Sequence, residues 1–249
     1  MSALISLIVV RHSERLDEVN EGEWKKIVQS KQGLRKSIKD DPILSPGNGI
    51  KYAAEVAQSL REMAGREARG REVKVYSSRL LRSVQTAAAI AQALAVPVHL
   101  CAGLSQIIPA VKKAGPGFQF ASIEELRGWC PGVEFVDCDD RRSSNFVPTI
   151  NWRQATLHIV NNPAYLPIIV GHRESVRKLA GEYLQTPYCC IGVFEMEGRT
   201  NAGGSASTVG APAADKISSS AAAAASDSKP RRSLERPQRS YRRPLPRRR

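Results

Sequence analysis

The sequence predicts an α/β fold, a three-layer sandwich in which a mostly parallel central sheet lies between helices on both faces. Short, continuous apolar runs rich in β-branched residues recur along the chain, with helical patterning between them. Such runs are typical of strands that are buried on both faces. Strands that alternate with helices indicate a parallel sheet, because a parallel pair needs a crossover connection.

Five apolar runs are candidates for the strands. The first, Leu7–Val10, contains only leucine, isoleucine and valine. The runs expected in the interior of the sheet are Leu7–Val10, Val73–Tyr76, Val96–Leu100 and Pro167–Gly171. A last strand is expected at an edge of the sheet, over Ile191–Met196.

Helical patterning fills the intervals between these strands. The expected helices are Ile50–Ala64, Leu80–Leu94, Thr149–Val160 and Glu174–Leu184. In the first of them, the residues predicted to share one buried face are Ala53, Ala54, Ala57, Leu60 and Ala64. The charged segment Asp17–Asp41 is expected to form a loop and a short helix that border the functional site.

The chain divides into a predicted folded domain over residues 1–198 and a predicted tail over residues 199–249. The tail is rich in Ala, Ser and Gly and then in Arg and Pro. It holds 12 Lys and Arg against 3 Asp and Glu, which is +9 of the net charge of +13. Because it has almost no large apolar side chains, burial cannot offset the entropy of ordering it, and we expect it to be disordered.

Several common classes of site and location are not indicated by the sequence. The five cysteines form no CxxC pair and have no zinc-finger spacing to a histidine, so we expect reduced thiols and no metal. No nucleotide-binding glycine motif indicates a cofactor. No stretch approaches the roughly 20 apolar residues that span a bilayer, and the N-terminus lacks the features of a signal peptide. We expect a soluble cytoplasmic protein, with the nucleus as the alternative location.

Basic and hydroxyl residues follow three of the predicted strands. They are Arg11, His12 and Ser13 after the first strand, Ser78 and Arg82 after the second, and His172 after Pro167–Gly171. Ligands of open parallel sheets bind outside the carboxyl ends of the strands, where these residues lie. Guanidinium groups bind phosphate through a planar fork of donors, and a neutral imidazole is a capable nucleophile near pH 7. Singly, each residue is explained by a helix cap or an exposed face, but together they predict a site for a phosphoryl dianion.

Four segments, in order, resemble the motifs of the histidine phosphatase (phosphoglycerate mutase-like) superfamily. They read LIVVRHSERLD, DPILSPGNGIKYAAEVAQSL, VYSSRLLRSVQTAAAIAQAL and PIIVGHRESVRKLAG, and the resemblance covers about residues 4–198. It implies that His12 accepts the phosphoryl group and that water then hydrolyses the phosphohistidine. It also implies that Arg11, Arg82 and His172 stabilise charge on the phosphoryl oxygens.

The first motif indicates a branch within the superfamily. RHSERLD is closer to the RHGERxD of the branch that includes phosphotyrosine-cleaving enzymes than to the mutases, so mutase activity is the least favoured reading. Ser13 stands where that motif has glycine, which narrows the site slightly and adds a hydroxyl donor. Ser13 and Ser78 are therefore candidate substrate-binding residues.

The general acid is where the sequence departs from the family. The family usually has a glutamate in a GLxE-type loop after the third strand, whereas this chain reads AGLSQ and places Gln106 there. Glutamine can bind a leaving group but cannot protonate it, a loss on the order of 10²–10⁴-fold in rate. Phenols, with a pKa of about 10, leave more readily without help, so aryl phosphates are expected to be favoured. Glu174 is the candidate substitute acid, and a first-turn carboxylate at a helix N-terminus is its ordinary alternative.

Two functions remain open from the sequence. The first is a phosphomonoester hydrolase whose substrate is a phosphorylated small molecule or a phosphoprotein. The second is a catalytically impaired phosphoryl-binding or scaffold domain of the same fold, which Gln106 favours. In either case the basic tail is expected to attract a polyanion or an import receptor.

Overall fold

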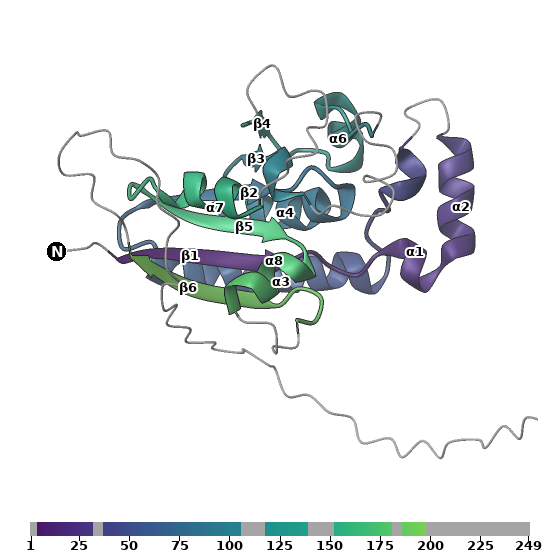
Figure 1. The fold of residues 1–249 in the computed structure, drawn as a ribbon. Coiled ribbons are helices and arrows are strands. Elements are labelled where there is room, and N and C mark those ends of the chain that lie inside the picture. The colour runs from purple at the N-terminus through teal and green to yellow at the C-terminus, as the bar shows by residue number, and fades with distance from the viewer. Residues whose placement is uncertain (1–3, 32–36, 106–117, 139–151, 181–185, 198–249) are drawn as a thin grey trace, which may run out of the picture.

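The computed structural model describes residues 4–31, 37–105, 118–138, 152–180 and 186–197. These residues form an α/β sandwich around a six-stranded sheet (Figure 1). The predictions for Gln106 and for the tail lie outside the described residues. None of the described helices is long and apolar enough to cross a membrane.

The sheet has the strand order β4-β3-β2-β5-β1-β6. Its strands are β1 (Leu4–Arg11), β2 (Glu72–Ser77), β3 (Val98–Leu100), β4 (Phe135–Asp137), β5 (Tyr165–Gly171) and β6 (Ile191–Glu197). Every neighbouring pair is parallel except β1 and β6, which are antiparallel. The mostly parallel sheet is thus confirmed, with β1, β2, β3 and β5 in its interior and β6 at an edge. The other edge, β4, is a strand that the sequence did not predict.

Helices cover both faces of the sheet. They are α1 (Leu16–Val19), α2 (Glu21–Ser30), α3 (Asn48–Glu67), α4 (Leu81–Leu94), α6 (Ile123–Trp129), α7 (Trp152–Val160) and α8 (Arg173–Ala180), with short 3-10 turns η1 (Ile38–Asp40) and η2 (Ala102–Leu104). Ile8 and Val10 of β1 belong to the core that α3 and α4 cover. Leu7 and Val9 belong to the core under α7 and α8. The alternation explains why this strand is apolar throughout, since both of its faces are buried.

One prediction about the buried face of α3 is wrong. The buried residues of this helix are Gly49, Ala53, Val56, Ala57, Leu60 and Ala64. Ala54 is exposed, and Val56 lies on the buried face instead. With 3.6 residues per turn, a position three residues after Ala53 stays near the same face, whereas the next residue turns away from it.

The segment predicted as a loop and a short helix has more structure than expected. It contains α1, the ten-residue helix α2 and the turn η1. Trp24 anchors it, because this side chain is buried and its Nε1–H donates to the carbonyl of Lys39 at 3.2 Å. The anchor holds α1 next to the residues that follow β1, in front of the carboxyl ends of the strands (Figure 1).

Candidate functional site

The carboxyl ends of three neighbouring strands bring the predicted site residues together. His12 follows β1, Ser78 follows β2 and His172 follows β5, and in the sheet β5 lies between the other two strands. Backbone hydrogen bonds continue the ladder past the strand ends. His12 N–H donates to the Gly171 carbonyl at 3.0 Å, and Ser78 N–H donates to the Val170 carbonyl at 3.1 Å. Residues 12, 78 and 172 of the sequence therefore meet at one edge, as open parallel sheets arrange their ligand sites.

His12 is buried and held in one tautomer. Its Nδ1 lies 2.8 Å from the carbonyl oxygen of Ser13. A carbonyl can only accept, so the proton is on Nδ1 and the lone pair is on Nε2. Burial, the Arg82 guanidinium and then the Arg11 guanidinium hold the pKa of His12 well below its ordinary value. The imidazole is neutral at pH 7, and Nε2 is a nucleophile without prior loss of a proton.

His172 lies beside His12 and contacts Ser78. The two imidazole rings meet edge to face with centroids 5.3 Å apart, and His172 Nε2 lies 2.9 Å from Ser78 Oγ. Leu80 N–H donates to the same Oγ at 3.4 Å, and the hydroxyl proton can point to His172 Nε2. In that arrangement the proton of the neutral ring is on Nδ1. This buried atom has no hydrogen-bond partner among the described residues, so it is a donor available to an anion.

Arg82, one residue into α4, supplies a buried positive charge. Its side chain is 2 % exposed, and Nη1 lies 3.9 Å from Asp41 Oδ1. Asp41 Oδ1 also accepts from Leu81 N–H at 2.7 Å. The same carboxylate therefore caps the start of α4 and holds the guanidinium of Arg82 in place. Burial lowers the pKa of Arg82 to about 10, which still leaves it charged at pH 7. Its buried Nε has no partner within the described ranges.

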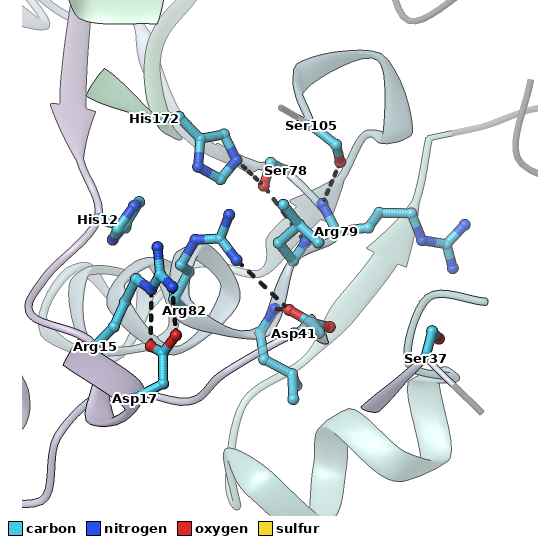
Figure 2. A network of polar contacts seen from close by, with 12 residues as sticks. His12, Arg15, Asp17, Ser37, Asp41, Ser78, Arg79, Arg82, Ser105 and His172 are labelled. Carbon is cyan, nitrogen blue, oxygen red and sulfur yellow. Dashed lines mark hydrogen bonds and ion pairs between the residues drawn. The ribbon is translucent and has the colours of Figure 1, made fainter. Parts of the chain in front are cut away.

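Arg15 is a third arginine of the site, which the sequence did not single out. It binds Asp17 through two hydrogen bonds, Nε to Oδ1 at 2.9 Å and Nη2 to Oδ2 at 2.5 Å, and its Nη1 lies 3.0 Å from Glu18 Oε1. Figure 2 shows the guanidinium groups of Arg15 and Arg82 beside the ring of His12. Its place three residues after His12, at the start of α1, was the available signal.

The side chain of Arg11 contacts the loop before β6. Its Nη1 donates to the carbonyl of Thr186 at 2.6 Å, and its guanidinium carbon lies 3.9 Å from the centre of the Tyr188 ring. The Tyr188 ring also lies 5.6 Å from the His12 ring, and its hydroxyl donates to Glu18. Tyr188 thus places an aromatic surface next to His12, a feature that sequence reasoning missed.

The remaining predicted site residues are Ser13, Glu174 and Gln106. The Ser13 hydroxyl donates to the carbonyl of Gly49 at 2.7 Å, so its proton is used to hold the start of α3. Glu174 lies in the first turn of α8, partly exposed, where it accepts from Arg173 Nε at 3.2 Å. Gln106 lies outside the described residues. Among the described residues, no group of three or more His, Cys, Asp or Glu side chains could hold a metal ion.

The arrangement favours a small dianion. Arg15 and Arg82 lie beside His12 (Figure 2), and burial and then the charges of Arg82 and Arg11 help to keep both imidazoles neutral by lowering their pKa. Three of the site's donors, Arg11 Nε, Arg82 Nε and His172 Nδ1, are buried without protein partners in the described part of the chain. Buried donors are costly unless they bind something, and a phosphoryl group offers several acceptor oxygens with the opposite charge.

The comparisons with known proteins agree with this geometry. A family model described as "Histidine phosphatase superfamily (branch 1)" matches residues 7–108, which include Arg11, His12, Arg15 and Arg82. Residues 7–108 of this chain therefore match the histidine phosphatase superfamily. This match supports a phosphatase function. Comparison with curated protein sequences gives no significant match.

Several solved phosphatase structures are similar to this chain at low sequence identity. The ecdysone phosphate phosphatase from Bombix mori, in complex with tungstate, is 18% identical with a TM-score of 0.54, over 84% of this chain and 98% of that one. A phosphoserine phosphatase from Entamoeba histolytica is 23% identical with a TM-score of 0.40, over 76% and 89%. The mycobacterial glucosyl-3-phosphoglycerate phosphatase is 13% identical with a TM-score of 0.42, over 76% and 90%. At these identities, the first of the three similarities shows the common fold and no common substrate.

Proposed function

We propose that this chain is a phosphomonoester hydrolase of the histidine phosphatase superfamily and works through a phosphohistidine on His12. The observation that carries the proposal is the tautomer of His12. With Nδ1–H donated to the Ser13 carbonyl, Nε2 presents its lone pair beside Arg82 and His172. The proposed reaction begins when Nε2 attacks phosphorus and the bond between phosphorus and the leaving oxygen breaks.

The basic residues would stabilise the charge that builds on the phosphoryl oxygens. Arg82 offers Nε and His172 offers Nδ1–H, both already positioned by Asp41 and Ser78. Donors that are fixed before the reaction need no reorganisation at the transition state, which is why such contacts contribute strongly to rate. Water then attacks the phosphohistidine and releases inorganic phosphate, and the proton it loses accompanies the phosphate.

The leaving group that the enzyme is expected to favour depends on its general acid. Gln106 stands in the acid's place in the sequence, and Glu174 is paired with Arg173 on the exposed start of α8. A phenol leaves with less help from an acid than an alkyl alcohol does. The Tyr188 ring beside His12 adds an aromatic surface that an aryl group can stack on. We therefore propose aryl phosphates, of the phosphotyrosine kind, as the favoured substrates.

Hydrolysis of p-nitrophenyl phosphate from pH 4 to pH 8 tests the proposal. The wild-type chain is expected to turn over this substrate, and His12→Ala is expected to lose activity by at least about 10³-fold because the nucleophile is gone. His158→Ala is the matched control, since this histidine is exposed on α7, and it should keep wild-type activity. Rapid quenching followed by mapping of acid-labile phosphate is expected to place the phosphoryl group on His12.

A second candidate function rests on Gln106. If folded wild-type protein binds orthovanadate but does not turn over any aryl phosphate, the hydrolase proposal is wrong and the phosphoryl-binding domain is right. Gln106→Glu restores a carboxylate at this position. A gain of on the order of 10²-fold on an alkyl phosphate would show that only the acid had been lost.

A further inference from the structure

We propose that Cys101 and Cys138 are a thiol pair that peroxide oxidises to a disulfide, with His99 as the base that activates Cys138. This site lies at the β4 edge of the sheet and does not depend on the proposed hydrolase activity. All five cysteines are thiols in the structure.

The register of β3 and β4 places the two cysteines opposite one another. Leu100 pairs with Asp137 as the last residues of the parallel ladder, and Cys138 N–H continues it by donating to the Leu100 carbonyl at 3.0 Å. Cys101 keeps an extended backbone, with φ −132° and ψ 111°. The next opposed pair is therefore Cys101 and Cys138. Neighbouring strands lie about 4.8 Å apart, within the range of about 4.4–6.8 Å between the Cα atoms of disulfides.

Contacts across three strands place the two thiols on one face of the sheet. His99 lies two residues before Cys101, so the two side chains leave β3 on the same side. Cys138 Sγ lies 3.5 Å from His99 Nδ1, which puts this thiol on that side as well. On β2, Tyr76 stacks on His99 with ring centroids 5.1 Å apart. Burial and then both thiols raise the pKa of Tyr76 to about 12, so the phenol stays neutral beside them.

His99 is a neutral imidazole within hydrogen-bonding distance of the Cys138 thiol. Burial and the nearby Lys74 charge lower its pKa, so the ring is neutral at pH 7 and Nδ1 can accept from Cys138 Sγ. Cys138 is exposed and Cys101 is half-buried. This difference makes Cys138 the thiol that meets an oxidant in solution and Cys101 the thiol that resolves the product.

The chemistry balances with hydrogen peroxide as the oxidant. The Cys138 thiolate attacks one peroxide oxygen, the O–O bond breaks, and the hydroxide that leaves takes the proton from His99 to become water. Cys101 then attacks the sulfur of the resulting sulfenic acid, the S–O bond breaks, and a second water leaves. The two sulfurs together give two electrons to one molecule of peroxide.

Peptide mapping of the full chain after oxidation tests the pair. Reduced protein is treated briefly with hydrogen peroxide, remaining thiols are blocked with N-ethylmaleimide, and the digest is analysed without reductant. The expected product is a cross-linked peptide that contains Cys101 and Cys138 and has lost two hydrogen atoms. Cys101→Ser is expected to leave Cys138 as a sulfenic acid that dimedone traps, because its resolving thiol is gone.

Two further variants separate the proposal from general thiol oxidation. Cys189→Ser is the matched control, since it removes a half-buried thiol in a different part of the fold, and it should keep the cross-link. His99→Gln is expected to slow the cross-link by on the order of tenfold, because the thiolate is the reactive form. Full alkylation of both cysteines in the oxidised wild type, or Cys138 joined to another cysteine, would overturn the pair. An unchanged rate in His99→Gln would overturn the role of the base.

Discussion

At the residue scale, the candidate site contains two histidines that stay neutral although three arginines lie near them. Burial is the main cause that holds the pKa of His12 and of His172 well below the ordinary value of 6.5, and the Arg82 charge adds to it in both cases. A protonated ring would place a further positive charge next to three guanidinium groups. The same environment that keeps Nε2 of His12 available for attack therefore makes the fold sensitive to acid.

The two histidines predict a loss of stability on acidification. Below pH 6.5 the unfolded chain binds protons that the folded chain does not, so the free energy of unfolding falls as the pH falls. Each ring contributes up to about 2 kcal/mol of this fall between pH 7 and pH 5. Urea unfolding of the ligand-free chain at both pH values measures it.

Variants assign this pH dependence to particular residues. His12→Asn should reduce the fall by up to about 2 kcal/mol, since one of the two groups is gone. His158→Asn changes an exposed histidine and should leave the fall as it is in the wild type. Equal falls in all three proteins would contradict the buried, neutral state of His12.

At the element scale, the start of α3 supports the loop that carries His12. Gly49 accepts from Ser13 Oγ through its carbonyl at 2.7 Å and donates through its N–H to Ser45 Oγ at 2.7 Å. A Cβ atom at this position would lie 2.4 Å from the backbone oxygen of Glu14 and 2.9 Å from Ser45 Oγ. The helix can approach the His12 loop this closely only without a side chain.

Gly49→Ala is therefore expected to destabilise the protein and to displace the loop. We expect a loss of about 1–3 kcal/mol in the free energy of unfolding, as for other overpacked sites, together with a lower kcat on p-nitrophenyl phosphate. Gly65→Ala is the control on the same helix, because a Cβ there meets nothing within 4 Å. Helix propensity predicts that it stabilises the chain by up to about 1 kcal/mol. Equal stability of the two variants would contradict the close approach at Gly49.

At this scale, the sequence predicted the longer elements and missed the shortest ones. The apolar runs and the periodic helices identified β1, β2, β3, β5 and β6, because burial leaves a pattern in the chain itself. The three-residue strand β4 and the seven-residue helix α6 were missed, since elements this short contain too few turns or alternations to show a period.

The site residues divide in the same way, into those that the nearby sequence indicates and those that only the fold brings into the site. Arg11, His12, Arg82 and His172 stand at strand ends or in a first helical turn, and their types indicated phosphate chemistry before any geometry was known. Asp41 and Tyr188 could not be found this way. Asp41 reaches Arg82 from 41 positions earlier in the chain, and Tyr188 reaches Arg11 from the loop before β6. Only the tertiary fold, which brings the end of η1 to α4 and the loop before β6 to the end of β1, places them there.

At the scale of the whole molecule, charge and folding are expected to belong to different parts of the chain. Residues 199–249 carry +9 of the net charge of +13, and the sequence predicts that they add no packed core. The described fold ends with β6 at Glu197. A chain cut after residue 198 keeps all six strands and most of the acidic residues, so it should lose polyanion affinity and little else.

Removal of residues 199–249 is thus expected to leave the melting temperature within about 2 °C of the full chain, less than a change of roughly 1 kcal/mol would cause. Hydrolysis of p-nitrophenyl phosphate should also be unchanged. The salt concentration that elutes the protein from immobilised heparin should fall steeply, because phosphate and sulfate polyanions bind through counterion release that scales with the number of basic contacts. Differential scanning calorimetry and the elution profile measure the two effects on the same sample. If the shortened chain instead melts many degrees lower while its heparin affinity stays the same, the tail packs on the domain and the division of charge from folding is wrong.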